Sequence, residues 1–246
     1  MEYLKSNMSR YVHTLETHNQ KAAEIVLPLL FQFFNPISLL DVGCGIGTWL
    51  SVAKKLGVLD VKGVDADYVD RILLRKYFSE EDFISHDLTR PLELGRKFDL
   101  CLCLEVAEHL PENSGETLID TLVCHSDMIL FSAAIPGQGG QNHINEQEPQ
   151  YWIEKFAKRG YNVFDPIRPL VWNNDSVDFW YRQNIFVFSK KSLGLNQPTF
   201  LYLVHPKLYQ IQVKKIGQLE RQLGKIKSGN VSFRFYLKGL IKSLFQ

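Results

Sequence analysis

Leu39-Leu40-Asp41-Val42-Gly43-Cys44-Gly45-Ile46-Gly47-Thr48 is the stretch of sequence that decides the fold. The apolar run over 38–42 predicts a buried strand, and the closely spaced glycines after it predict a tight turn into a helix. At such a turn the backbone amides can approach a ligand, and the helix dipole favours negative charge, so a nucleotide-like ligand is indicated. The spacing is G-x-G-x-G and not the G-x-G-x-x-G of dinucleotide folds.

Strand and helix patterns alternate along the chain on both sides of this turn. We expect strands over 38–42, 61–64, 83–85, 98–104, 127–135, 161–164 and 184–189. We expect helices over 14–34, 48–56, 70–78, 116–124 and 150–159. Alternation at this spacing requires right-handed crossovers, which place helices on both faces of a parallel sheet. The sequence therefore predicts an α/β fold with a doubly wound, Rossmann-like sheet.

The composition of the 246 residues is that of a globular protein. With 12% aromatic residues and a net charge of +1, the chain can bury enough apolar surface to exclude global disorder. No apolar run approaches the roughly 20 residues that span a bilayer. The first 20 residues lack the apolar core and the cleavage site of a secretion signal. These patterns predict a cytoplasmic protein.

Charge divides the chain into two parts. From Lys190 onward, 11 basic residues stand against one acidic residue, so the part before it carries an excess of acid. We expect a domain over 1–190 and a basic helical extension over 191–246. The acidic body argues against nucleic acid as a partner.

The basic extension holds two apolar stripes at helical spacing. They are Ile216, Leu219, Leu223 and Ile226, and then Phe233, Leu237, Leu240, Ile241 and Leu244. Such stripes predict an amphipathic surface that contacts either a second copy of the chain or, peripherally, the inner membrane surface.

Three acidic residues stand at the ends of expected strands, where parallel sheets bind ligands. Asp41 precedes the glycine turn, and a carboxylate there opposes a pyrophosphate but anchors a cation, which favours a sulfonium amino acid over NAD. Asp65 lies 24 residues later and is placed to accept both hydroxyls of a ribose. Asp87 follows the third strand and is placed to meet an adenine amino group.

The quoted stretch resembles the first motif of the class I S-adenosylmethionine-dependent methyltransferases. The resemblance continues, in order and spacing, through Gly63-Val64-Asp65-Ala66, His86-Asp87-Leu88 and Phe98-Asp99-Leu100-Cys101-Leu102-Cys103-Leu104-Glu105-Val106-Ala107-Glu108-His109-Leu110. It covers residues 14–189. The resemblance implies a seven-stranded, mostly parallel sheet in which the seventh strand, here 184–189, runs antiparallel between the fifth and the sixth.

The same resemblance implies a site for S-adenosylmethionine. The residues implied are Asp41, Gly43, Cys44, Gly45 and Gly47 around the methionine part, Asp65 with Ala66 at the ribose, Asp87 and Leu88 at the adenine, and Leu104 and Glu105 at the methyl-bearing end.

The polar loop after the fifth strand holds the candidates for catalysis. Methyl transfer to a hydroxyl requires a positioned acceptor and a group that takes the hydroxyl proton. His143 is the first candidate, because an imidazole is suited to take a proton near neutral pH, and Glu146 is the second. The alternative is that His143 only shapes the acceptor site or caps the next helix.

A metal site is the alternative use of Glu105, Glu108 and His109. Residues three and four apart share a helix face and can hold a divalent ion, as similar clusters do in the ubiquinone-pathway O-methyltransferases. Because this pattern is widespread in the broader family with a structural role, no metal is expected.

The sequence thus predicts a methyltransferase that acts on a hydroxyl-bearing acceptor, with a sugar or an intermediate of polysaccharide synthesis first in order. This choice depends on the polar loop around His143 and on the basic extension, and partly on a resemblance to methyltransferases of surface-glycan and natural-product pathways. A small-molecule or quinone-type O- or N-methyltransferase is the first alternative. A domain that binds the cofactor or a partner without catalysis is the second.

Overall fold

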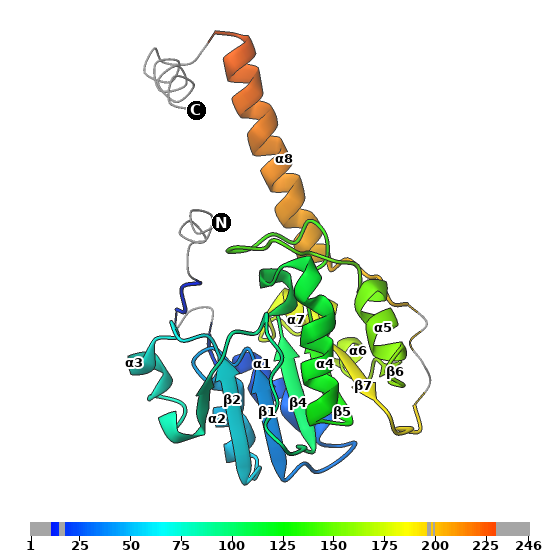
Figure 1. Cartoon of the computed structure of the whole chain (residues 1–246). Helices are drawn as coiled ribbons and strands as arrows, with labels where there is room; N and C mark the ends of the chain where they lie inside the picture. Colours follow the sequence, from blue (N-terminus) through cyan, green and yellow to red (C-terminus); the bar gives the residue numbers. More distant parts are fainter. Residues whose placement is uncertain (1–10, 15–17, 196–197, 199, 230–246) are drawn as a thin grey trace. The chain divides into compact units, whose positions relative to one another are not determined.

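The computed structural model describes residues 11–14, 18–195, 198 and 200–229 (Figure 1). Its centre is a seven-stranded sheet in the order β3-β2-β1-β4-β5-β7-β6. β7 runs antiparallel to β5 and to β6, whereas the other neighbouring strands pair in parallel. The predicted fold class is therefore confirmed.

The elements follow the expected order along the chain. The strands are β1 (Ser38–Val42), β2 (Asp60–Asp65), β3 (Phe83–Ser85), β4 (Leu100–Leu104), β5 (Met128–Ser132), β6 (Asn162–Phe164) and β7 (Phe186–Ser189). The α-helices are α1 (Lys21–Leu30), α2 (Thr48–Lys55), α3 (Arg71–Leu74), α4 (Gly115–His125), α5 (Pro149–Ala157), α6 (Arg168–Val171), α7 (Phe179–Asn184) and α8 (Pro206–Lys227). Short 3-10 turns are η1 (Glu80–Asp82), η2 (Ala107–His109) and η3 (Glu112–Ser114).

Two helices are shorter by several residues than the sequence predicts. α1 begins at Lys21 and not near residue 14, and the Asn19 side chain accepts a hydrogen bond from the Lys21 N–H at its start. Residues 15–17 of that expected helix lie outside the described part. The helix expected over 70–78 is only the single turn α3. The next helical turn is η1, and the Ser79 side chain caps it by accepting the Glu81 N–H.

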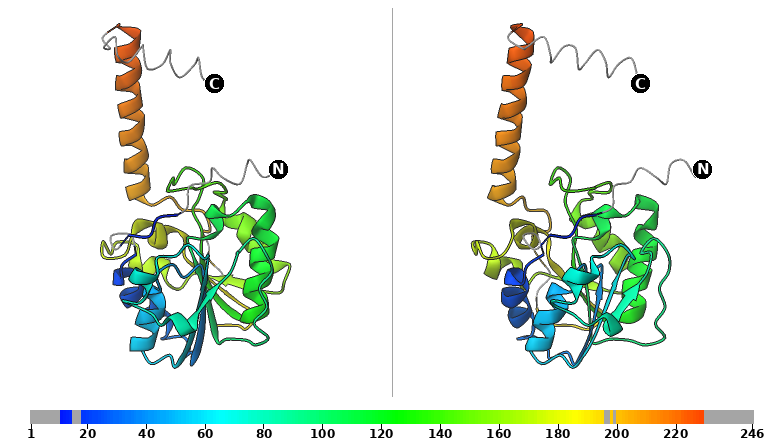
Figure 2. Two further views of the ribbon diagram at one scale, coloured as in Figure 1. Left: turned by 60° about the vertical axis from the view of Figure 1, so that its left-hand side comes forward. Right: turned by 90° about the vertical axis from the view of Figure 1, so that its left-hand side faces the viewer.

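Apolar side chains alternate between the two faces of the sheet and build two core layers. On one face, Leu39 of β1 and Leu102 of β4 pack with α1 and α2. On the other face, Leu40 and Cys103 pack with α4 and α5. Figure 2 shows these helices on opposite sides of the sheet. Because β4 is buried on both faces, its sequence lacks the polar alternation of a half-exposed strand.

The direction of the strands places the loops that follow β1, β2, β4 and β5 at one edge of the sheet. β1, β2, β4 and β5 are parallel, so their carboxyl ends meet at the same edge of the sheet. The strand order reverses between β1 and β4, since the next strands lie on opposite sides of this pair. At such a switch point an α/β sheet opens a crevice for ligands.

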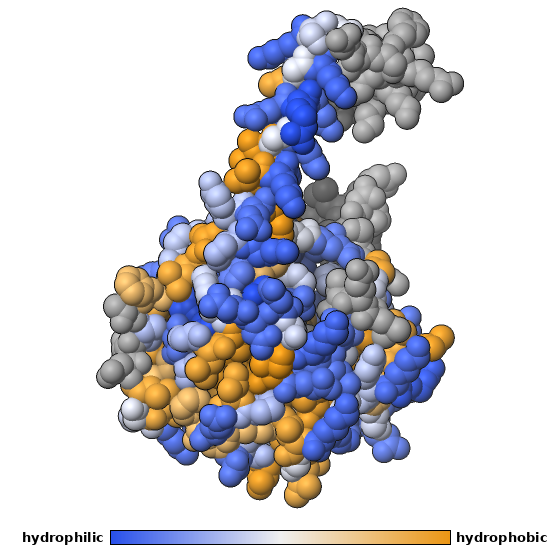
Figure 3. Space-filling model, turned by 180° about the vertical axis from the view of Figure 1, so that it is seen from behind, coloured by the Kyte–Doolittle hydropathy of each residue, from blue (hydrophilic) through white to orange (hydrophobic). Residues whose placement is uncertain are grey.

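The chain divides into two compact units, residues 1–205 and 206–246. In the second unit, α8 carries the predicted stripe of Ile216, Leu219, Leu223 and Ile226, all exposed, together with basic side chains (Figure 3). The stripe expected over 233–244 lies outside the described residues, and the domain boundary after residue 190 stays a prediction. Among the described residues, no helix combines the length and the apolar character needed to cross a bilayer.

Candidate active site

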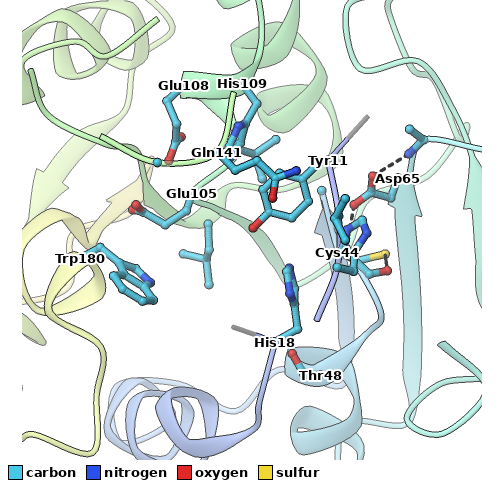
Figure 4. Close-up of a pocket in the computed structure, with 18 of the residues that line it drawn as sticks. Tyr11, His18, Cys44, Thr48, Asp65, Glu105, Glu108, His109, Gln141 and Trp180 are labelled. Carbon is cyan, nitrogen blue, oxygen red and sulfur yellow. Dashed lines mark hydrogen bonds between the residues drawn. The ribbon is translucent and has the colours of Figure 1, made fainter. Parts of the chain in front are cut away.

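A cavity of about 740 Å³ lies at the carboxyl edge of the sheet. Its walls come from the turns after β1, β2, β3 and β4, the loop after β5, the α7 region and the N-terminal residues around Tyr11 (Figure 4). Of the eleven residues that the resemblance implies for the cofactor, all except Gly47 line this cavity. Gly47 instead begins α2 and lies against Phe78, where a Cβ would come within 2.6 Å of the Phe78 Cβ.

The glycine turn is shaped by backbone geometry that only glycine adopts readily. Gly43, Gly45 and Gly47 have φ of +85°, +53° and +79°. The N–H groups of Gly43 and Cys44 donate to the Val64 carbonyl, which ties the turn to β2. A Cβ on Gly43 would lie 2.2 Å from a methyl carbon of Val106, so this close approach also requires glycine.

We expect Gly43→Ala to destabilise the chain by about 2 kcal/mol more than Gly57→Ala, because it adds a clash to the backbone strain. Gly57 is the matched control, since its φ is +98° but a Cβ there would meet nothing within 4 Å. Chemical denaturation of both variants measures the difference. Equal losses of stability would show that Val106 moves aside without cost.

Asp65 stands at the end of β2 and is held by the turns around it. One carboxylate oxygen accepts the Gly45 N–H at 2.7 Å, and the other accepts the Ala66 N–H at 2.6 Å. Burial raises the pKa of Asp65, and these two hydrogen bonds oppose the rise. Because a carboxylate oxygen has two acceptor sites, both oxygens can still accept a hydroxyl from the cavity. Figure 4 shows Asp65 and Cys44 on the side of the cavity opposite Glu105.

Asp41 lies at the end of β1, buried below the glycine turn. Burial, and then the negative charge of Asp65, raise the pKa of Asp41 to about 8. The ligand-free chain therefore holds a protonated acid here at neutral pH, and a cation in the cavity would favour the ionised form.

The raised pKa of Asp41 predicts that the stability of the chain depends on pH, and that Asp41→Asn removes this dependence. Because the pKa is higher in the folded chain than in the unfolded one, the folded chain binds more protons between about pH 4 and about pH 8. The free energy of unfolding therefore falls as pH rises through this window. We expect ligand-free Asp41→Asn to gain stability over the natural chain between pH 5 and pH 8 in thermal or urea unfolding. If the difference in free energy of unfolding between Asp41→Asn and the natural chain did not change with pH, the raised pKa of Asp41 would be contradicted.

Glu105, directly after β4, is held by amide side chains that sequence reasoning did not single out. Its carboxylate accepts hydrogen bonds from Gln138 at 2.9 Å and from Asn184 at 3.1 Å. Its φ of +55° is unusual for a residue other than glycine. Asn184 was expected to begin the seventh strand, but it ends α7 and points its amide at Glu105. Strained backbone of this kind clusters at functional sites.

His143 and Glu146 form a hydrogen-bonded pair in the loop after β5. His143 Nδ1 lies 2.8 Å from Glu146 Oε1, and the Glu146 carboxylate also accepts the N–H groups of Gly137 and Gly139. Nδ1–H donates to the Glu146 carboxylate, so Nε2 is the ring nitrogen that Glu146 leaves unused. His143 lines the cavity, whereas Glu146 lies behind it.

Glu108, His109 and His143 come together on the same side of the cavity. The metal alternative drawn from the sequence placed Glu105 with the first two, but in the structure Glu105 binds Gln138 and Asn184, and His143 takes its place in the cluster. Burial and the nearby Glu105 raise the pKa of Glu108, whereas burial lowers the pKa of His109 to about 4.

Aromatic residues of the N-terminal segment cover the glycine turn. His13 and His18 lie next to Gly45, and the Tyr11 ring packs edge-on against His109. Burial lowers the pKa of His18 to about 4, so it is neutral in this contact at physiological pH. The N-terminal segment therefore adds the rings of Tyr11, His13 and His18 to the cavity wall beside the glycine turn.

Comparison with known proteins places this architecture. Residues 11–122 match the family model described as "Methyltransferase domain". The fold is similar to that of the methyltransferase domain of the bacterial protein CtHen1-C, with 19% identity over 71% of this chain and 100% of that chain and a TM-score of 0.51. It is also similar to the sugar N-methyltransferase KedS8 from Streptoalloteichus sp ATCC 53650, with 14% identity over 76% of this chain and 98% of that chain and a TM-score of 0.53. DesVI from Streptomyces venezuelae has 15% identity over 72% of this chain and 94% of that chain, with a TM-score of 0.51. No curated protein matches the chain in sequence.

Proposed function

We propose that the chain is a class I S-adenosylmethionine-dependent methyltransferase that methylates a hydroxyl-bearing acceptor, with a sugar or an intermediate of polysaccharide synthesis as the first class. The match of residues 11–122 to a methyltransferase-domain model and the strand order of the sheet support this proposal. The observation that carries the choice of a hydroxyl is the His143–Glu146 pair at the cavity wall. A hydroxyl is a weak nucleophile until its proton is removed, and this pair is built to remove one.

The cavity fits S-adenosylmethionine in size and chemistry. Its volume lies within the usual range of ligand sites, and the close backbone approach at the glycine turn leaves room for a ligand along the amides. We assign the methionine part to Gly43 and Gly45 above Asp41, and the ribose to Asp65. The adenine is assigned to Asp87 and Leu88, and the methyl-bearing end to Leu104 and Glu105. Gly47 serves the turn and not the ligand, since it faces Phe78.

The residues of the cavity have separate tasks in the transfer. The bound cofactor supplies a methyl group on a sulfonium. Asp41 holds its amino-acid part and Asp65 holds its ribose. The rings of Tyr11 and His18 in the cavity wall exclude water. Bound there, the cofactor would supply the methyl carbon to the acceptor oxygen, and its sulfur would keep the electron pair of the broken carbon–sulfur bond. His143 Nε2 takes the hydroxyl proton, and Glu146 stabilises the imidazolium.

The acceptor side of the cavity supports a polar, hydroxyl-rich ligand. Gln141 brings an amide group to the wall, and Trp180 offers an aromatic face. Such a combination of an amide and an aromatic ring is suited to a sugar. A small-molecule O-methyltransferase is the second candidate, and the observation that favours it is the ion-binding geometry of Glu108, His109 and His143.

The basic extension is assigned a targeting task under the same proposal. The exposed stripe of α8 and its surrounding lysines suit either an anionic membrane surface or a second copy of the chain. A protein at the inner membrane surface would meet lipid-linked intermediates there. Salt-sensitive binding to anionic liposomes that is lost when residues 206–246 are deleted supports the membrane part. Association that survives this deletion contradicts it.

The acceptor class is tested with methyl-labelled S-adenosylmethionine and fractionated extract of the source cells. Label in a lipid-linked glycan fraction supports the first class, and label in a small-molecule fraction supports the second candidate. Absence of label from every fraction, with cofactor binding measured by calorimetry, would instead favour a non-catalytic binding domain.

A further inference from the structure

We propose that Glu105 and the ring of Trp180 form a subsite for a protonated amino group, so that the acceptor is a sugar that carries an amine as well as the hydroxyl to be methylated. Both side chains line the cavity, and Figure 4 shows them on the same side of it, across from Asp65. The choice of a sugar rests on the function proposed above, whereas the amine subsite rests on the contacts of Glu105.

Glu105 is the last acceptor in a chain of buried amide side chains. Its carboxylate accepts hydrogen bonds from Gln138 at 2.9 Å and from Asn184 at 3.1 Å. The side-chain oxygens of these two amides accept in turn from Gln183 Nε2, at 3.2 Å and 2.9 Å. The Gln183 oxygen accepts the backbone N–H of His205 at 2.8 Å. The amides therefore link a backbone donor outside the cavity to the carboxylate inside it.

The direction of this chain is fixed at its far end. A backbone N–H only donates, so the side-chain oxygen of Gln183 must face His205 and its NH2 group must face the other two amides. Those amides then turn their oxygens to Gln183 and their NH2 groups to Glu105. Because both NH2 groups point at Glu105, its carboxyl group serves as an acceptor, which suits the ionised form. The chain of amides thus presents a negative charge to the cavity.

This charge has no basic side chain to pair with in the cavity wall. Among the described residues that line the cavity, none is a lysine or an arginine. The nearby His143 is bonded to its own carboxylate, Glu146. Burial raises the pKa of Glu105, and the hydrogen bonds from Asn184 and Gln138 oppose the rise. A carboxylate withdrawn from water is stable when it is paired, so a positive group on the ligand suits this wall and a negative one does not.

The helix α7 brings aromatic rings to the same carboxylate. Trp180 lies four residues before Asn184 in α7, so the two side chains share one face of the helix, and Asn184 binds Glu105. Tyr181 lines the cavity as well, and burial and then the nearby Glu105 raise the pKa of its hydroxyl. The face of an indole attracts cations, so a carboxylate beside it favours an ammonium group over a neutral hydroxyl.

The acceptor supplies the donors that Glu105 suits better than the cofactor does. The sulfonium of the cofactor has no N–H to donate, and its amino-acid part is assigned above to the glycine turn and Asp41. A protonated amine brings hydrogen-bond donors together with its charge. It has no lone pair, so it cannot take the methyl group, and transfer goes to the hydroxyl whose proton His143 takes. Glu105 is thus a specificity-determining residue, and the base role of His143 is kept.

Pairs of sugars that differ only in an amine test the subsite without methyl transfer. Glucosamine, galactosamine and mannosamine are each compared with glucose, galactose and mannose in ligand-detected NMR with the full chain, alone and with S-adenosylhomocysteine. We expect the amino sugar of at least one pair to bind about 10-fold more tightly than its parent. Glu105→Gln, which removes only the charge, should abolish this preference. Asp67→Asn is the matched control, because it removes an exposed carboxylate of the cavity wall just after β2 and should keep the preference.

Equal affinities within all three pairs, or a preference that Glu105→Gln retains, would overturn the proposal. The product labelled in source-cell extract gives a second readout, because an amine holds it on a cation exchanger until the amine is acetylated. A labelled methyl ether that is not held would refute the subsite and leave the proposed function standing. An amine preference that depends on Glu105, with no label transfer to any fraction, would support the subsite and refute the proposed function.

Discussion

Replacement of His143 by alanine is expected to lower the turnover of methyl transfer about 10²-fold or more and to leave the affinity for S-adenosylmethionine nearly unchanged. The expectation follows from the place of His143 in the cavity wall, where Glu146 holds its Nδ1. Without this imidazole the acceptor hydroxyl keeps its proton, and the cofactor contacts on the opposite wall remain. Single-turnover label transfer and cofactor calorimetry measure the two effects separately.

The control for this variant is His86→Ala, which removes a histidine near the same edge of the sheet but outside the cavity wall. It should retain the turnover of the unmutated chain. Equal turnover in His143→Ala would return His143 to a structural role in its loop.

Asp65→Ala is expected to weaken binding of S-adenosylmethionine by about 1–3 kcal/mol, which corresponds to roughly 5- to 150-fold in affinity. The change removes the acceptor of the ribose hydroxyls and also frees the N–H groups of Gly45 and Ala66. Asp65→Asn keeps one oxygen acceptor and should fall between the alanine variant and the natural chain. Calorimetry with S-adenosylmethionine measures all three.

Asp127→Ala is the control, since it removes a carboxylate that pairs with Lys97 just before β5, at the opposite edge of the sheet. Its cofactor affinity should not change. If Asp65→Ala bound the cofactor as tightly as the control, the assignment of the ribose to this residue would be wrong.

The fold was predictable because its signals are local. The apolar runs of β1 and β4, the glycines after β1 and the acids at strand ends each lie within a few residues of the feature that they indicate. Once parallel strands are inferred, their carboxyl ends must share an edge, so Asp41 and Asp65 had to meet. The cavity lies where this reasoning placed it.

The acceptor side could not be predicted in the same way, because its contacts join residues far apart in sequence. Asn184 binds Glu105 across 79 positions, and His143 reaches Glu108 through the fold of a long loop. Polar side chains carry no periodicity that reports such partners. The assignment of Gly47 to the ligand was wrong because a glycine motif does not show which of its glycines faces the ligand. Gly47 faces Phe78, which lies 31 positions later in the sequence. The local signals were the Gln and Asn residues around His143 and the pattern of Glu105, Glu108 and His109 after β4.

The most direct test of the central claim is to identify the atom of the acceptor to which the methyl group is bonded. The labelled product, made from methyl-labelled S-adenosylmethionine and source-cell extract, is divided into two parts. One part is treated with alkali to release ester-bound label, and the other is hydrolysed in acid and analysed by mass spectrometry. The account predicts label in an O-methyl monosaccharide, or at least in an alkali-stable methyl ether, and its loss in the reaction with Asp65→Ala. Label on nitrogen or in an alkali-labile ester would contradict a hydroxyl acceptor.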